Sequence, residues 1–140
     1  MVVVTELSAS RIPVGVTGAG EWVYLAREGE WSSLTRSSPN FLVTVLQQGG
    51  AFHVDLRDRL VAVGLTPSLA ETFPVDSSLW LGLTSPSEFW QQVALDWLKR
   101  EGGIEAFAPE LEALVKMGRT QRIRHTARRL VGEVRSQRGE

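Results

Sequence analysis

The first 36 residues carry apolar and β-branched runs that predict an antiparallel sheet. These runs span residues 2–7, 12–17, 22–26 and 31–35. Valine, isoleucine and aromatic side chains suit a pleated, half-buried surface, and Gly18 and Gly20 supply the backbone freedom of a tight turn. Pro13 has no amide hydrogen to donate, so it belongs at a strand start or at a sheet edge. The short connections between successive runs favour a meander of three or four strands.

From residue 37 onward, apolar side chains recur at helical spacing instead. The predicted helices span about residues 39–48, 55–63, 67–73, 88–100, 109–117 and 120–137. Ser37-Ser38-Pro39 offers a cap followed by proline at the first helical position, and Ser85-Pro86-Ser87-Glu88 matches a capping box. Residues 74–83 are predicted to be extended, with Trp80 and Leu81 in one more strand or in a buried crossing.

Together these elements predict an α+β fold. An N-terminal antiparallel sheet of three or four strands is expected to pack against four to six C-terminal helices, within a single domain over residues 1–140. Residues 1–36 are mainly strands in this prediction, and residues 37–140 are mainly helices. A chain of 140 residues, 43% of them hydrophobic, can bury a core without disulfides. Because the chain has no cysteine, a disulfide scaffold and a thiolate metal site are excluded.

Charge is distributed unevenly along the chain, whose net charge is −1. Residues 119–140 hold seven arginines and two glutamates and carry +5, whereas residues 1–118 hold eight basic and fourteen acidic side chains and carry −6. Every cation of the basic stretch is a guanidinium, a planar fork suited to carboxylate or phosphate. This asymmetry makes the last predicted helix, about 120–137, the candidate binding element.

On a helical projection, this last helix has an apolar stripe between two rows of arginines. The stripe comprises Ile123, Ala127, Leu130, Val131 and Val134. The flanking rows are Arg124, Arg128 and Arg135 on one side and Arg122 and Arg129 on the other. A helix docked by its stripe presents both rows at its margins, where guanidiniums can bind carboxylates of a protein partner or phosphates of a nucleic acid. Alternatively, the arginines complement the helix dipole, cover apolar surface or pair with the chain's own carboxylates.

The segment from Asp55 to Phe73 resembles the helix-turn-helix of bacterial regulators. It has a helix, a turn at Gly64, a Thr66-Pro67 cap and a second short helix. The resemblance implies that the second helix enters the major groove of DNA. Residues 67–73 contain no Arg, Lys, Asn or Gln to read base edges. An ordinary helical hairpin is therefore the competing interpretation.

Five tryptophans are plentiful for a chain of this length. Tryptophan is favoured in cores and also as an anchor at interfaces. Trp90 and Trp97 lie seven residues apart on one predicted helix, so they project from roughly the same side. Their spacing is consistent with core packing, with a partner surface formed by Trp90 and Trp97, and with self-association into a homo-oligomer.

No linear motif indicates catalysis, a cofactor or a metal. Gly15, Gly18 and Gly20 lack the spacing of a dinucleotide-binding turn. His53 and His125 are far apart, and neither has a second histidine at ligand spacing. We therefore expect no catalytic residue, no metal and no cofactor. No apolar run is long enough to cross a bilayer, and the first residues lack the pattern of a signal peptide, so a cytoplasmic protein without a membrane partner is expected.

These observations favour a small, non-enzymatic binding or regulatory protein. Its predicted partner is an acidic protein surface, which the arginine-flanked last helix would bind. One alternative is a nucleic-acid-binding transcriptional regulator that uses the same arginines for phosphate contacts. The second alternative is an enzyme whose carboxylates are dispersed in sequence and brought together by the fold.

Overall fold

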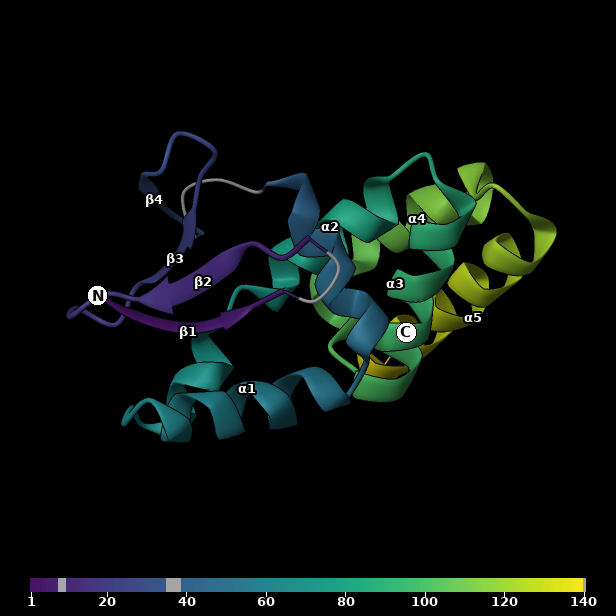
Figure 1. Cartoon of the computed structure of the whole chain (residues 1–140). Helices are drawn as coiled ribbons and strands as arrows, with labels where there is room; N and C mark the ends of the chain where they lie inside the picture. Colours follow the sequence, from purple (N-terminus) through teal and green to yellow (C-terminus); the bar gives the residue numbers. More distant parts are fainter. Residues whose placement is uncertain (8–9, 35–38, 140) are drawn as a thin grey trace. The chain divides into compact units, whose positions relative to one another are not determined.

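The computed structural model has an α+β fold, in which a four-stranded antiparallel sheet is followed by helices (Figure 1). It describes residues 1–7, 10–34 and 39–139. The chain forms two compact units, residues 1–78 and 79–140, and each is described by itself. The α+β class predicted from the sequence is confirmed, and a single domain stays a prediction.

The sheet is a meander in which each strand pairs with the next. Its strands are β1 (Val2–Glu6), β2 (Pro13–Val16), β3 (Trp22–Leu25) and β4 (Trp31–Ser33), in the order β1-β2-β3-β4. Pro13 is the first residue of β2, as its missing amide hydrogen requires, and it lies opposite Glu6 of β1. The predicted end of the fourth strand, residue 35, lies outside the described residues.

In the N-terminal unit, the first and third helical elements are shorter than predicted, and the second begins earlier than predicted. They are the 3₁₀ helix η1 (Asn40–Gln48), the α-helix α1 (Ala51–Ala62) and the 3₁₀ helix η2 (Pro67–Thr72). Pro39 is the residue before η1 and not its first helical residue, and the predicted cap at Ser37 and Ser38 falls outside the described residues. The helix predicted at 55–63 begins earlier, at Ala51, because Phe52 adds a buried first turn to the face of Leu56 and Leu60.

Trp22 is the centre of the aromatic core of this unit, and it is 1% exposed. Its indole Nε1 donates to the backbone oxygen of Leu69 at 3.2 Å and to Oγ1 of Thr72 at 2.9 Å. Phe73 packs edge-on against Trp22, with ring centroids 5.2 Å apart, and also against Phe52, at 5.0 Å. The sheet is thereby joined to both η2 and α1, and α1 lies along β1 in Figure 1.

The helices that follow are α2 (Val75–Thr84), α3 (Glu88–Glu101), the 3₁₀ helix η3 (Ile104–Phe107), α4 (Ala108–Met117) and α5 (Gln121–Gln137). The prediction of an extended segment at 74–83 is wrong, because these residues form α2. Leu79 and Leu83 are buried four residues apart, and Asp76 lies in the first turn, where a carboxylate complements the helix dipole. Tertiary burial of this helical face outweighs the strand propensity of Val75 and Trp80.

The cap of α3 is displaced by two residues from its predicted position. Ser87, and not Ser85, precedes the helix, and its Oγ accepts from the amide of Trp90 at 3.4 Å. Ser85 instead accepts from the amide of Ser87 at 3.0 Å. The remaining predicted helices, at 109–117 and 120–137, are confirmed by α4 and α5. Within the described chain, no helix combines the length and hydropathy that crossing a bilayer requires.

Candidate functional site

The apolar stripe of α5 is buried, as predicted. The helix begins after Thr120, whose Oγ1 accepts from the amide of Ile123 at 3.1 Å. The buried members of the stripe are Ile123, Ala127, Leu130, Val131 and Val134. They pack against α4 and α3 within the C-terminal unit. Because the stripe faces inward, both arginine rows lie at the margins of the buried face.

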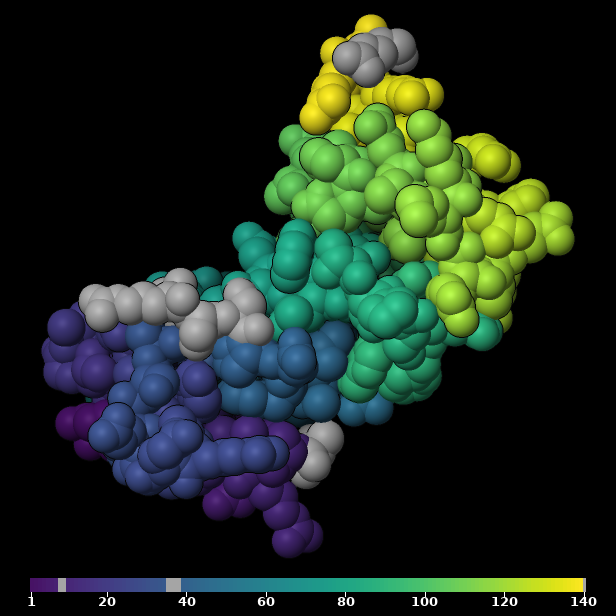
Figure 2. Space-filling view, turned by 90° about the horizontal axis from the view of Figure 1, so that it is seen from above, coloured from purple at the N-terminus to yellow at the C-terminus, as the bar shows by residue number. Residues whose placement is uncertain are grey.

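Four of the five candidate arginines are exposed, and the fifth supports the fold. Arg122, Arg128, Arg129 and Arg135 are exposed side chains of α5. In the space-filling view, the yellow-green to yellow end of the chain lies at the surface (Figure 2). Arg124 is half-buried, and its Nη1 donates to the backbone oxygen of Gly118 at 2.8 Å. This bond ties α5 to the end of α4, so Arg124 is a structural residue in this fold.

Gly118 allows α4 and α5 to approach each other closely. A Cβ atom at this position would lie 2.8 Å from the backbone oxygen of Leu114 and 2.8 Å from Cγ2 of Ile123. Both distances are shorter than van der Waals contact. Any larger residue would therefore force the connection between the two helices apart.

The arginines of α5 are not paired with the chain's own carboxylates in the described residues. Over residues 1–7, 10–34 and 39–139, the ion pairs are Arg57–Glu71, Arg59–Asp55 and Arg100–Glu101. Even Glu133, which follows Arg129 by one helical turn, forms no ion pair with it within these ranges. Pairing with the chain's own carboxylates, which was one alternative to partner binding, is therefore not seen for these arginines in the described residues.

One arginine row borders a groove between α4 and α5, which here is called the basic groove. Its volume is about 500 Å³. The charged residues of its lining are Lys116, Arg128, Arg135 and Glu112, and Val115 and Val131 also line it. Three cations against one carboxylate make the potential in the groove positive. On the helical projection, Arg122 and Arg129 lie on the other side of the buried stripe.

The two candidate tryptophans do not share a surface. Trp97 is 3% exposed and belongs to the core of the C-terminal unit, where the Arg100 guanidinium lies 5.8 Å from its ring centroid. Trp90 is half-buried and packs edge-on against Phe89, with ring centroids 4.9 Å apart. Phe89 itself is 53% exposed. Although the two tryptophans are seven residues apart on α3, Trp97 is buried in the core whereas Trp90 is only half-buried.

The hairpin that resembles a helix-turn-helix lacks a long second helix. Its second element, η2, is a 3₁₀ helix over Pro67–Thr72. The only charged residue of this element, Glu71, accepts from Nη2 of Arg57 at 2.9 Å. Arg57 lies on the first helix, α1, so this pair joins the two arms of the hairpin. This geometry favours the ordinary helical hairpin.

The Arg57–Glu71 pair has a measurable consequence at acidic pH. The hydrogen bond from the Arg57 guanidinium lowers the pKa of Glu71 below its ordinary value. The contribution of this pair to stability is therefore present above the unfolded-state pKa of the carboxyl and is lost as pH falls through the lowered folded-state value. It is small because both side chains are exposed. We expect Arg57→Ala to raise the pKa of Glu71 in an NMR titration of its side-chain carboxyl, and an unchanged titration would contradict the pairing.

Neither histidine belongs to a cluster with ligating chemistry. Nε2 of His125 lies 3.4 Å from Nε2 of Gln121, and the ring of His53 packs edge-on against Phe52. In the part of the chain that the structure describes, no three histidine or acidic side chains are close enough to hold a metal ion. What the arrangement offers chemically is a set of exposed guanidiniums on a helix that is anchored by a buried stripe.

Comparison of the chain with protein-family models, with curated proteins and with solved structures finds no match.

Proposed function

We propose that the chain is a non-enzymatic binding protein whose α5 binds an acidic protein surface. The observation that carries this proposal is that Arg122, Arg128, Arg129 and Arg135 are exposed and form no ion pair within the described residues. Each guanidinium can bind a carboxylate through two parallel hydrogen bonds. Because α5 is anchored by its buried stripe, the arginines are carried on a rigid element, and the backbone of the helix loses little freedom on binding.

Acidic side chains among these arginines favour a protein partner over a nucleic acid. Glu112 lines the basic groove together with Lys116, and Glu133 lies one turn from Arg129 on the other row. A continuous phosphate backbone would be repelled by both carboxylates. A protein surface can place its own acidic and basic groups to match this alternation, and its apolar side chains can contact Val115 and Val131.

The proposal is tested by removing the four exposed guanidiniums together. The variant Arg122→Gln with Arg128→Gln, Arg129→Gln and Arg135→Gln is compared with the parent chain by fluorescence anisotropy, using a labelled glutamate-rich peptide as the probe. Exposed charge pairs contribute roughly 0.2–1 kcal/mol each, so the loss of four, about 0.8–4 kcal/mol, should weaken binding by about four-fold or more. Binding by the parent chain should also weaken as salt is added.

A variant with the same charge change in the N-terminal unit is the control. Arg11, Arg27, Arg57 and Arg59 are all exposed there, and their joint replacement by glutamine should leave peptide binding unchanged. Equal loss of affinity in both variants would reject a specific role of α5. A single-stranded oligonucleotide of matched charge serves as the competing probe, and tighter binding of the oligonucleotide than of the peptide would replace this proposal with the nucleic-acid alternative.

A further inference from the structure

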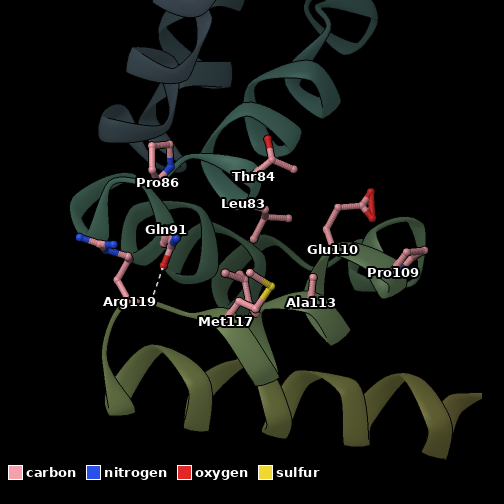
Figure 3. Close-up of a pocket in the computed structure, with 10 residues that line it drawn as sticks. Leu83, Thr84, Pro86, Gln91, Pro109, Glu110, Ala113, Met117 and Arg119 are labelled. Carbon is pink, nitrogen blue, oxygen red and sulfur yellow. Dashed lines mark hydrogen bonds between the residues drawn. The ribbon is translucent and has the colours of Figure 1, made fainter.

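A second groove of the C-terminal unit, here called the apolar groove, lies where α2, α3 and α4 meet (Figure 3). Its volume is about 530 Å³. Leu83 and Leu114 are lining residues that are almost fully buried, at 3% and 4% exposure. Pro86 and Ala113 also line the groove, and both are exposed. These four residues provide an apolar surface, buried at the two leucines and accessible to solvent at Pro86 and Ala113.

Met117 is the most unusual residue of this groove. Its side chain is 80% exposed, the largest exposed fraction of any large apolar side chain in the described residues. Methionine is flexible and polarisable, and it adapts to partner side chains at binding surfaces. Nothing in the fold of the described C-terminal unit uses Met117 as a core residue. Met117 lines the groove, so its side chain is placed to contact a segment bound there.

The groove has a positive end and a negative end. Glu110, Ala113 and Met117 follow one face of α4, and Arg119 lies two residues after the end of this helix. Figure 3 shows Met117 and Ala113 between the Arg119 guanidinium and the Glu110 carboxylate. Along the helix axis, Glu110 and Met117 are about 10 Å apart. An occupant of the groove therefore meets an apolar centre with a cation on one side of it and a carboxylate on the other.

The position of Arg119 is fixed by a buried glutamine. Gln91 is 4% exposed, and its Oε1 accepts from the backbone amide of Arg119 at 3.0 Å. Its Nε2 donates to the backbone oxygen of Ser85 at 2.8 Å, so one side chain joins the segment before α3 to the segment after α4. Both polar atoms of Gln91 are thus used within the fold. The guanidinium of Arg119, which is exposed, is left as the charged group at this end.

We infer that the apolar groove binds a short peptide segment of a partner protein in which an apolar side chain is next to a carboxylate. The apolar side chain would lie over Leu83 and Leu114 against Met117, and the carboxylate would pair with Arg119. This charge complementarity selects an acidic segment at the Arg119 end and disfavours a basic one there. The inference does not depend on the arginines of α5, because none of them lines this groove.

The test uses three labelled peptides and the full chain. The first peptide has a leucine-rich centre with glutamate on one side and neutral residues on the other. In the second peptide lysine replaces glutamate, and in the third serine replaces leucine. By fluorescence anisotropy we expect the parent chain to bind the first peptide about ten-fold more tightly than either of the others.

Variants of the groove should change this preference in a defined direction. Arg119→Glu should invert it, so that the lysine peptide binds more tightly than the glutamate peptide, an outcome that unfolding cannot produce. Ala113→Arg should weaken binding of both leucine-containing peptides, because a long side chain would cover the apolar surface. Lys99→Glu makes the same charge change on an exposed residue of α3 that does not line the groove, and it should leave the preference unchanged.

Several results would overturn the inference. They are equal binding of the glutamate and lysine peptides by the parent chain, no binding of any peptide, and a preference that Arg119→Glu leaves intact. If the glutamate peptide is lost only when the four arginines of α5 are replaced, α5 is its binding site, and this inference fails while the proposed function stands. If Arg119→Glu inverts the preference while the α5 variant binds the leucine-containing peptide normally, the apolar groove stands, and the proposed function is decided separately by the glutamate-rich peptide.

Discussion

Trp22→Ala should lower the free energy of unfolding by about 3–5 kcal/mol, the range expected when a large aromatic side chain is removed from a core. Trp22 is 1% exposed, and alanine would leave a cavity beside the rings of Phe73 and Phe52. The change would also leave the backbone oxygen of Leu69 without the indole donor. Urea denaturation followed by circular dichroism measures the effect, since the loss of one of five tryptophans would complicate a fluorescence signal.

Two further substitutions separate the contributions to this effect. Trp22→Phe keeps an aromatic ring but removes the Nε1 donor to Leu69 and Thr72. It should therefore lower the free energy of unfolding by less than Trp22→Ala does. Trp31→Ala removes a half-buried tryptophan of β4 and should cost less than Trp22→Ala. If Trp22→Ala lowered the free energy of unfolding by less than about 1 kcal/mol, Trp22 would not be the centre of this core.

Gln91→Leu should have the largest effect of any polar substitution in the C-terminal unit, about 2–5 kcal/mol. The two side chains are of similar size, so the cost comes from hydrogen bonds and not from a cavity. The backbone oxygen of Ser85 and the amide of Arg119 would both lose their partner. An unsatisfied buried group costs roughly 1–3 kcal/mol. Two part-buried groups lose their partner here, and water reaches them in part, so the expected loss lies below the full sum of about 6 kcal/mol.

The neighbouring glutamine provides a matched control. Gln92 donates from Nε2 to Oδ1 of Asp96 at 2.9 Å, an exposed hydrogen bond within α3. Gln92→Leu should therefore change the free energy of unfolding by no more than about 0.5 kcal/mol. Both variants are compared by urea denaturation. Similar losses from Gln91→Leu and Gln92→Leu would show that the side chain of Gln91 does not support the connection after α4.

The fold was predictable from the sequence where local pattern and tertiary packing agree. The β-branched runs and turn glycines predict the meander, and the helical period around Leu111 and Ile123 predicts α4 and α5. The pattern fails at residues 74–83, where Val75 and Trp80 favour a strand but the burial of Leu79 and Leu83 selects a helix. It also does not distinguish η1 from an α-helix, because the same apolar spacing is compatible with both hydrogen-bond patterns.

The candidate site was predictable only in the parts that depend on a single helix. The projection of α5 identifies its buried stripe and the exposed arginines on either side. It does not reveal that Arg124 donates to Gly118, since that oxygen belongs to the preceding connection. The apolar groove is formed by residues of α2, α3 and α4 that are distant in sequence. Its one local signal is the run Met117-Gly118-Arg119, in which an exposed methionine ends α4 and an arginine lies two residues further along the chain.

The short segment between α4 and α5 is bonded from two directions. Gln91 of α3 accepts from the amide of Arg119, and Arg124 of α5 donates to the oxygen of Gly118. Hinges in proteins are formed by a few loop or helix-end residues that absorb changes in φ and ψ. Here both peptide groups are occupied, and Gly118 lies too close to Leu114 and Ile123 to admit a methyl group. These contacts hold the end of α4 and the first turn of α5 in one fixed geometry, so the connection between them is not a hinge.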